Sequence, residues 1–302
     1  MDTSFNPNVP TLGIDIGGTS VKAALLDHDT PVWTAQSPFY ARPDVNTLIH
    51  AIRSAVSRLD EFSAPIDRVG ICVPGLLDAD KTRVVRSVNV PGLMELSLVD
   101  LVRESSPRLE HAHLKVVTDA FSCATDVISQ LKLTGRVLTI ALGTGVGASV
   151  VDVADGVLSP LRISGESPGH FGQLDCSLDD DAPVGPDGGR GSLEAYIGVP
   201  ALRRDFNDDV ASALASLTID SPALRALARA IRIAHAIYRP DHVVLAGGIG
   251  IRLAPHLDTI KTLVDRDLTS VARPGRSLQT AVDDFHAARG AARIAQIRIE
   301  NR

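Results

Sequence analysis

A stretch near the N-terminus, Leu12 to Asp27, constrains the fold more than any other part of the chain. It reads LGIDIGGTSVKAALLD, in which an apolar run, a Gly-Gly-Thr turn and a second apolar run follow one another. This order predicts two β-strands joined by a tight turn, with Asp15 at the end of the first strand.

The turn in this stretch, Gly17-Gly18-Thr19, has the composition of a phosphate-binding bend. Glycines permit positive φ angles and leave backbone N–H groups uncovered, so several N–H dipoles can point at one anion. A carboxylate such as Asp15 is favourable beside a phosphate when a divalent cation lies between them, so we expect Mg²⁺ there. Taken alone, the same turn is equally compatible with a plain hairpin.

A second copy of this plan lies at 137–152, VLTIALGTGVGASVVD. Aligning the two copies places Gly17 on Gly143 and Asp15 on Ala141. Two copies of one phosphate-binding hairpin predict two related domains that hold one polyphosphate from both sides. Because the second copy lacks the carboxylate, we expect only the first domain to hold the metal.

The composition limits the class of protein. A length of 302 residues is enough for two domains with cores of their own. The net charge of −6 argues against an electrostatic surface for nucleic acid or membranes. The three cysteines are widely spaced, and no signal segment or membrane-length apolar run is present. We therefore expect a cytoplasmic protein with neither a nucleic-acid nor a membrane partner.

Asp119 lies between the two glycine turns in the sequence. It follows a short predicted strand, Lys115 to Thr118, and opens a helical stretch. An aspartate in that place can serve simply as a helix N-cap. A helix cap could equally be Ser or Thr, however, so capping does not explain why the residue at position 119 carries a charge. The alternative hypothesis is a general base held at a strand–helix junction.

Polar residues on loops rich in glycine and proline are candidates for binding a polyol. Pro74-Gly75 ends a buried run, and ligands bind at such strand ends in α/β folds. Asn89 is the one strong hydrogen-bonding side chain of the next loop, and Glu166 and His170 share a third. Glu194 lies near a helix start, where the helix dipole favours its charge whether or not it binds anything. The simpler interpretation is a set of structural and surface loops.

Two further patterns concern helices. Asn46 is predicted to cap a helix whose apolar stripe includes Leu48 and Ile52. Gly247 and Gly248 lie between a buried strand and a helix, where glycines permit close approach of a flat ligand or a phosphate. The spacing is not GxGxxG, so a dinucleotide-binding fold is not indicated.

Taken together and in this order, the motifs resemble the ROK family of sugar kinases and sugar-responsive repressors, part of the actin-like, hexokinase-like ATPases. The matching segments are Asp15 to Thr19, Val73 to Gly75, Asn89 to Gly92, Thr118 to Ala120, Gly143 to Gly147, Gly169-His170, Gly191 to Glu194 and Ala246 to Gly248. The resemblance implies an α/β fold of two actin-like, ribonuclease H-like lobes with a central ligand cleft. It also implies a smaller N-terminal domain of residues 1–118 plus 289–302 and a larger C-terminal domain of residues 119–288.

The resemblance also implies roles for single residues. Asp119 would be the base that takes a proton from a sugar hydroxyl. The residues implied to surround ATP and Mg²⁺ are Asp15, Gly17, Gly18, Thr19, Gly143, Thr144, Gly145, Gly247 and Gly248. Those implied to hold the sugar are Gly75, Asn89, Thr118, Glu166, His170 and Glu194. Lys22 could add a positive charge beside the phosphates, although an exposed strand lysine is the simpler interpretation.

The chain departs from the family pattern at three places. The family usually has Asn at the position of Thr118, and Glu at the position of Ser167, three residues before the His. The aligned stretch 185–192 lacks the cysteines that hold a zinc ion in many members. We therefore predict no structural zinc, and the identity of the sugar stays open.

We expect an ATP-dependent kinase that phosphorylates a hydroxyl of a sugar, as a glucokinase-like hexose kinase does, or of a sugar-like polyol. We further expect a homodimer. Two alternatives remain: a catalytically degenerate, sugar-binding regulatory protein of the same family, and a phosphoanhydride hydrolase on the same fold that uses water as acceptor. Dependence of ADP release on added sugar separates the kinase from both.

Overall fold

The computed structural model describes residues 10–94, 96–162, 170–186, 188–206, 209–268 and 275–296. The chain divides into two compact units, which are described separately below. Unit 1 comprises Met1–Asp126 with Phe285–Arg302, and unit 2 comprises Val127–Asp284. The domain boundaries inferred from the family resemblance, after residues 118 and 288, remain a prediction.

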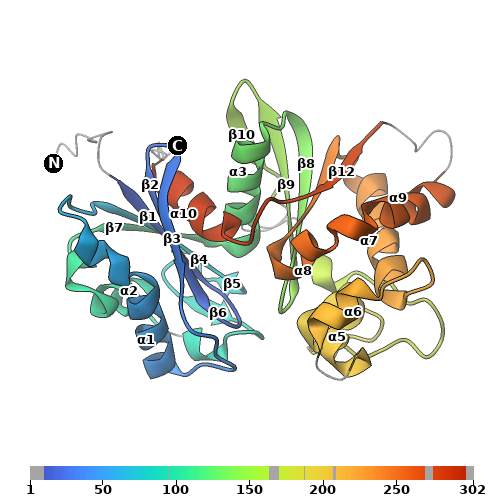
Figure 1. Ribbon diagram of the computed structural model, residues 1–302, viewed down its shortest axis with the longest axis horizontal. Helices are drawn as coiled ribbons and strands as arrows, with labels where there is room; N and C mark the ends of the chain where they lie inside the picture. Colours follow the sequence, from blue (N-terminus) through green and yellow to red (C-terminus); the bar gives the residue numbers. More distant parts are fainter. Residues whose placement is uncertain are drawn as a thin grey trace. The chain divides into compact units, whose positions relative to one another are not determined.

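Each unit is built on a mixed five-stranded sheet, and the two sheets share one strand plan (Figure 1). The sheet of unit 1 has the order β3-β2-β1-β4-β7, with β1 Thr11–Ile16, β2 Val21–Asp27, β3 Thr30–Gln36, β4 Arg68–Val73 and β7 His113–Thr118. The sheet of unit 2 has the order β10-β9-β8-β11-β12, with β8 Gly135–Leu142, β9 Val146–Ala154, β10 Val157–Pro160, β11 His242–Ala246 and β12 Ser277–Thr280. In both sheets, the first three strands of this order are paired antiparallel with one another. The last two strands run parallel to the central one, which is β1 in unit 1 and β8 in unit 2. The shared plan confirms the internal repeat predicted from the two glycine turns.

Helix α10, His286–Gln296, lies directly on one face of the unit 1 sheet. A Cβ atom added to Gly13 of β1 would lie 1.8 Å from the carbonyl oxygen of Ala288. A Cβ added to Gly70 of β4 would lie 1.9 Å from that of Ala291. Only glycine lets the helix backbone come this close. Because side chains alternate along a strand, Asp15 shares the face of Gly13.

The opposite face of this sheet is covered by α1, Val45–Ala55, and α2, Leu98–Ser105, over the apolar side chains of β1, β2 and β4. The predicted cap of α1 is wrong. The N-cap is Asp44, whose carboxylate accepts a hydrogen bond from the Thr47 N–H at 2.8 Å. Asp44 has the extended backbone that a cap requires, whereas Asn46 already lies in the first helical turn.

Short elements complete unit 1. They are the two-stranded sheet of β5 Leu76–Leu77 and β6 Val84–Arg86, and the 3₁₀ helices η1 Ser57–Glu61, η2 Pro91–Leu93 and η3 Pro107–Leu109.

Helix α3, Asp119–Leu131, follows β7 without a loop, and its first two turns belong to unit 1. A buried ionic cluster ties these turns to α10. The Asp126 carboxylate accepts hydrogen bonds from His286 at 2.6 Å and from the Nε atoms of Arg289 and Arg293 at 2.8 Å each. All four side chains are buried. The cluster therefore fixes the direction in which α3 leaves the end of β7, where Asp119 lies.

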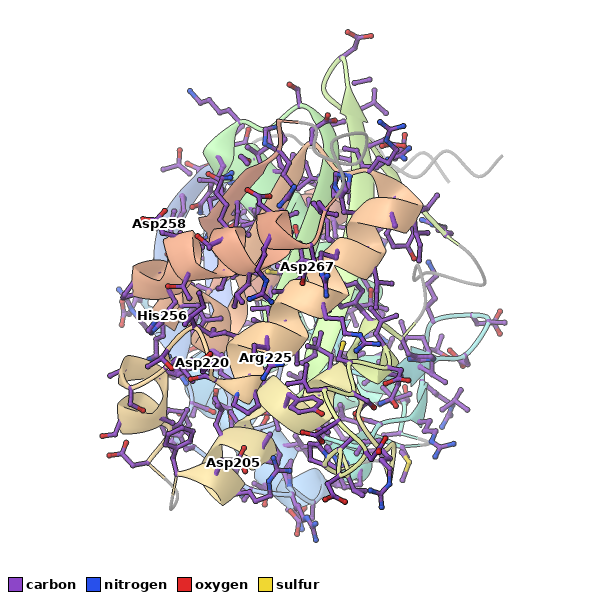
Figure 2. All side chains as sticks on the ribbon, turned by 90° about the vertical axis from the view of Figure 1, so that its right-hand side faces the viewer. Asp205, Asp220, Arg225, His256, Asp258 and Asp267 are labelled. Atoms are coloured by element: carbon purple, nitrogen blue, oxygen red, sulfur yellow. The ribbon has the colours of Figure 1, made fainter. Side chains whose placement is uncertain are left out.

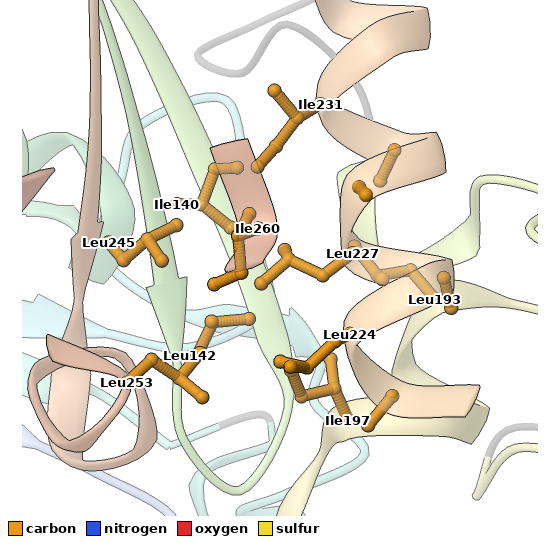
Figure 3. Close-up of a cluster of buried hydrophobic side chains, with 14 of the residues drawn as sticks. Ile140, Leu142, Leu193, Ile197, Leu224, Leu227, Ile231, Leu245, Leu253 and Ile260 are labelled. Carbon is orange, nitrogen blue, oxygen red and sulfur yellow. The ribbon is translucent and has the colours of Figure 1, made fainter. Parts of the chain in front are cut away.

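The core of unit 2 lies between the sheet and α7, Pro222–Tyr238 (Figure 3). The apolar stripe of α7 includes Leu224, Leu227 and Ile231, and it packs toward Ile140 and Leu142 of β8. The other helices of this unit are α4 Leu193–Ile197, α5 Val199–Asp205, α6 Val210–Ala215, α8 Gly247–Arg252, α9 Leu257–Arg266, η4 Phe171–Gln173 and η5 Ala254–His256.

The solvent side of α7 and α9 is polar, as Figure 2 shows for Arg225 of α7, Asp258 of α9 and Asp267, which caps the C-terminal end of α9. Arg232 of α7 forms an ion pair with Asp267 at 2.8 Å. Across the described ranges, no helix has the length and apolar character needed to cross a membrane.

Candidate active site

The turn between β1 and β2 is held through its carbonyl oxygens. The Gly17 N–H donates to the Ser20 oxygen at 3.0 Å, which closes the turn. Tyr40 then donates from its hydroxyl to the Gly17 oxygen at 2.6 Å and from its N–H to the Thr19 oxygen at 2.8 Å. Within the described part of the chain, no group accepts from the N–H of Gly18 or Thr19. The turn therefore offers the donors that a phosphate ligand needs.

Asp15 lies on β1 directly opposite Lys22 of β2 and Cys72 of β4. Residues paired in this way point to the same face of a sheet. The Cys72 thiol lies 3.5 Å from an Asp15 carboxylate oxygen and the same distance from the carbonyl oxygen of Ala287. The Lys22 ammonium lies 6.0 Å from the centroid of the Phe285 ring. A carboxylate, a thiol and an ammonium group thus gather beside the first glycine turn.

Asp119 is the first residue of α3, immediately after the last residue of β7. Its carboxylate accepts a hydrogen bond from the N–H of the next residue, Ala120, at 2.7 Å. A capping side chain would instead accept from the N–H two or three residues further on, so capping does not explain this aspartate. Burial raises the pKa of Asp119 to about 7, and the Asp15 carboxylate adds to the rise. An acid with such a pKa can take up a proton near neutral pH.

The other residues of unit 1 predicted to contact a sugar follow the same strand ends. Thr118 is the last residue of β7 and pairs with Val73 of β4, so it lies beside Asp119. Gly75 comes two residues after Val73, with φ at +108°, and an added Cβ would lie 2.2 Å from the Arg86 carbonyl oxygen. The positive φ and the lack of room for a Cβ atom therefore explain why residue 75 is a glycine, without any contact to a sugar. Asn89 is partly buried, and its side chain makes no hydrogen bond to any described residue.

The turn between β8 and β9 in unit 2 repeats the first turn with one residue fewer. The Gly143 N–H donates to the Gly145 oxygen at 3.0 Å, and the flanking strands resume pairing at Leu142 and Val146. As in the first turn, the structure describes no acceptor for the N–H groups that follow, those of Thr144 and Gly145. Both predicted turns are thus present, and in each the two amides after the first glycine donate to no described group.

Glu194 and Gly247 both lie against this second turn. The buried carboxylate of Glu194 accepts a hydrogen bond from the Val146 N–H at 2.8 Å. Gly247 has φ at +77°, and an added Cβ would lie 2.5 Å from the carbonyl oxygen of Leu142, the residue before the turn. Gly248 follows it in α8. Unit 2 therefore gathers its predicted nucleotide residues at the adjacent ends of β8 and β11.

The remaining predicted sugar ligands are only partly placed. His170 is exposed and precedes η4. The next-but-one residue, Gly172, packs so closely that an added Cβ would lie 2.6 Å from the Val146 oxygen and 3.1 Å from the Glu194 carboxylate. Glu166 lies outside the described residues.

The loop that aligns with the zinc ligands of the family is closed by main-chain hydrogen bonds. The N–H of Gly185 donates to the Gly189 oxygen at 2.8 Å, and that of Gly191 to the Pro183 oxygen at 2.7 Å. The Cys176 N–H donates to the Gly191 oxygen at 2.8 Å. These bonds provide connections across the loop that do not depend on cysteine thiolates. The absence of a structural zinc stays a prediction.

Tyr40 and Cys72 were not among the residues singled out from the sequence. Tyr40 is far from Gly17 in the sequence, and no local pattern connects the two. Cys72 reads as one more apolar residue of a buried strand. Its position opposite Asp15 follows only from the pairing of β1 with β4.

Comparison with known proteins places this geometry in a family. The ROK family model matches residues 11–298. The chain is 30% identical over 193 residues to an N-acetyl-D-glucosamine kinase of Yersinia pestis, which covers 61% of this chain and 73% of that protein. It is 27% identical over 305 residues to the N-acetyl-D-glucosamine kinase of Yersinia enterocolitica, which covers 93% and 97%.

A solved structure shows the same fold. The ROK family glucokinase from Streptomyces griseus, in complex with glucose and AMPPNP, superimposes with a TM-score of 0.75 at 20% identity, covering 95% of this chain and 99% of that one. The predicted α/β fold of the actin-like ATPase type, with its two mixed five-stranded sheets, is therefore confirmed.

Proposed function

The chain belongs to the ROK family, and we propose that it is an ATP-dependent kinase that transfers a phosphoryl group to a hydroxyl of a sugar. The observation that carries the proposal is Asp119, an acid with its pKa raised to about 7, in unit 1 with Asp15 and the first glycine turn. The relatives named above phosphorylate N-acetyl-D-glucosamine, and the glucokinase was solved with glucose. Hexoses and N-acetylated hexosamines are thus the proposed acceptors.

The residues of unit 1 fit a magnesium nucleotide. Asp15 helps to raise the pKa of Asp119, so the two carboxylates repel each other. A divalent cation held by Asp15 would relieve that repulsion, and carboxylate oxygens are the ligands that Mg²⁺ takes in proteins. The N–H groups of Gly18 and Thr19 would donate to phosphate oxygens. When bound, Mg²⁺ supplies charge neutralisation at the phosphates.

The residues of unit 2 supply further proposed contacts to the nucleotide. The N–H groups of Thr144 and Gly145 are the proposed donors to phosphate oxygens. Gly247 and Gly248 are the residues proposed to lie against the adenosine. In both turns the glycines keep side chains away from the ligand, so the backbone itself can approach it.

In the proposed reaction, Asp119 is the general base. Its carboxylate takes the proton of the acceptor hydroxyl, and the hydroxyl oxygen bonds to the transferred phosphorus as the bond to the ADP oxygen breaks. Such proton transfer contributes on the order of 10²–10⁴-fold to the rate. Thr118, Asn89, His170, Glu166 and Glu194 are the proposed groups that hold the sugar hydroxyls in place.

The test is ADP release from ATP and Mg²⁺ with a panel of hexoses, N-acetylated hexosamines and cyclitols. The proposal expects release that requires one sugar class and that collapses in Asp119→Asn while ATP binding persists. Release without added sugar would indicate a hydrolase, and sugar binding without release would indicate a regulatory protein. Either result would overturn the proposal.

A further inference from the structure

Glu194 connects a short helix to the second glycine turn. Helix α4 begins after Ser192, whose hydroxyl caps it by accepting from the Ala195 N–H at 3.3 Å. Glu194 is the second residue of the helix and is only 8% exposed. Its carboxylate is directed to the turn, where it accepts the hydrogen bond from the Val146 N–H at 2.8 Å. A buried carboxylate is stable only with such partners.

The segment that follows α4 holds the other end of the same turn. The Val199 N–H donates to the Gly143 carbonyl oxygen at 3.1 Å. Gly198 lies so close that an added Cβ would come to 3.1 Å from the Thr144 oxygen. The turn is thus fixed at its start by the backbone of residue 199 and at its end by the side chain of Glu194.

We propose that Glu194 is a positioning residue for the Gly143–Val146 turn. It fixes the peptide that ends the turn, and so sets the direction of the Thr144 and Gly145 amides. A negative charge beside a phosphate-binding turn is unfavourable for the phosphate, so its presence calls for a compensating role. The hydrogen bond to Val146 supplies that role. This inference rests on the proposed function and goes beyond it, because it assigns Glu194 to the nucleotide turn as well as to the sugar.

The first turn supports the same reasoning. It too is held by side chains from outside its hairpin: the Tyr40 hydroxyl donates to the Gly17 oxygen at 2.6 Å, and the Ser37 hydroxyl accepts from the N–H of Val21, the residue after the turn, at 3.0 Å. Val21 and Val146 each begin the second strand of their hairpin, so Ser37 and Glu194 accept from the same backbone position of the two repeats. In each repeat, a side chain from outside the hairpin therefore fixes the peptide that ends the glycine turn.

The decisive measurement is nucleotide affinity without sugar. Titration calorimetry with AMPPNP and Mg²⁺ compares the wild type with Glu194→Ala and Glu194→Gln. We expect Glu194→Ala to bind AMPPNP roughly tenfold more weakly, because a charge-assisted hydrogen bond that orders the turn is lost. Glu194→Gln should stay within about threefold of the wild type, since its amide oxygen can still accept from Val146. If Glu194→Ala binds AMPPNP as the wild type does, the inference is overturned.

A second readout does not depend on activity or nucleotide binding. Hydrogen exchange of the Val146 amide should be faster in Glu194→Ala and in Glu194→Asp, whose carboxylate is one methylene short, than in the wild type. Asp205→Asn, on the surface of α5, is the matched control and should leave that exchange unchanged. A wild-type protein that binds no nucleotide would contradict the proposed function, whereas unchanged Val146 exchange in Glu194→Ala and Glu194→Asp would contradict the positioning role.

Discussion

Burial raises the pKa of Asp119 to about 7, and the carboxylate of Asp15 adds to that rise. Asp15 is on β1 and Asp119 directly follows β7, and β4 lies between these two strands in the sheet. The relationship thus depends on the sheet order of unit 1 rather than on nearness in sequence.

The first prediction concerns the pH dependence of the reaction. A general base must be deprotonated to act, and Asp119 is protonated below a pH of about 7. The rate of sugar-dependent ADP release with both substrates well below their KM, which reports the free enzyme, should therefore fall about tenfold for each pH unit below that point. Initial rates between pH 5.5 and 8.5 provide the measurement. A rate that is constant across this range would exclude Asp119 as the base.

The second prediction concerns stability. The folded protein holds the Asp119 proton up to a pH of about 7, whereas the unfolded chain releases it near the usual value of 3.8. Stability attributable to this group therefore decreases as the pH rises from about 4 to about 7. Asp119→Asn should be more stable than the wild type at pH 8, by at most about 4 kcal/mol, and equal to it near pH 4. Urea unfolding at both pH values tests this, and a variant less stable at pH 8 would contradict it.

The local parts of the site could be predicted from the sequence. The hairpins around Gly17 and Gly143 follow from alternating apolar runs and glycine turns, and Asp119 follows from a strand that meets a helix. What could not be predicted depends on segments far apart in the chain. The contact of Tyr40 with the Gly17 oxygen and the bond from Val146 to Glu194 require a register and packing that one sequence does not reveal.

The cap of α1 shows a different limit. Asp44 and Asn46 are both good capping residues, and the choice between them depends on which one has the extended backbone. That angle is set by how the preceding segment approaches the helix, so composition alone cannot decide it.

The third prediction tests the close contact of α10 with the sheet. Gly13→Ala would place a methyl group 1.8 Å from the Ala288 carbonyl oxygen, so the helix or the strand must shift. We expect a loss of about 1–3 kcal/mol in the free energy of unfolding. Gly275→Ala is the control, because its new Cβ meets no atom within 4 Å. Thermal unfolding of both variants gives the comparison, and equal Tm values would show that α10 can move away without loss.

The fourth prediction concerns the buried cluster around Asp126. Burial alone would raise the pKa of this carboxyl group, but the hydrogen bond from His286 and the guanidinium groups of Arg289 and Arg293 outweigh it, so the pKa is lowered. The stabilisation is therefore present above the unfolded value near 4 and is lost as the pH falls through the folded pKa.

Asp126→Ala would leave the two guanidinium groups buried without their shared carboxylate, which we expect to cost about 3–5 kcal/mol at pH 7. The matched control is Asp29→Ala, because Asp29 pairs with Arg293 from a side chain that is 85% exposed, and exposed pairs contribute less than about 1 kcal/mol. Chemical unfolding at pH 7 and at pH 3.5 separates the two variants. The Asp126 effect should be smaller at pH 3.5, since this pH lies below the usual pKa of 3.8 and the carboxyl group of the unfolded wild-type chain then takes up a proton. An equal loss in both variants at pH 7 would mean that the cluster does not hold α3 against α10.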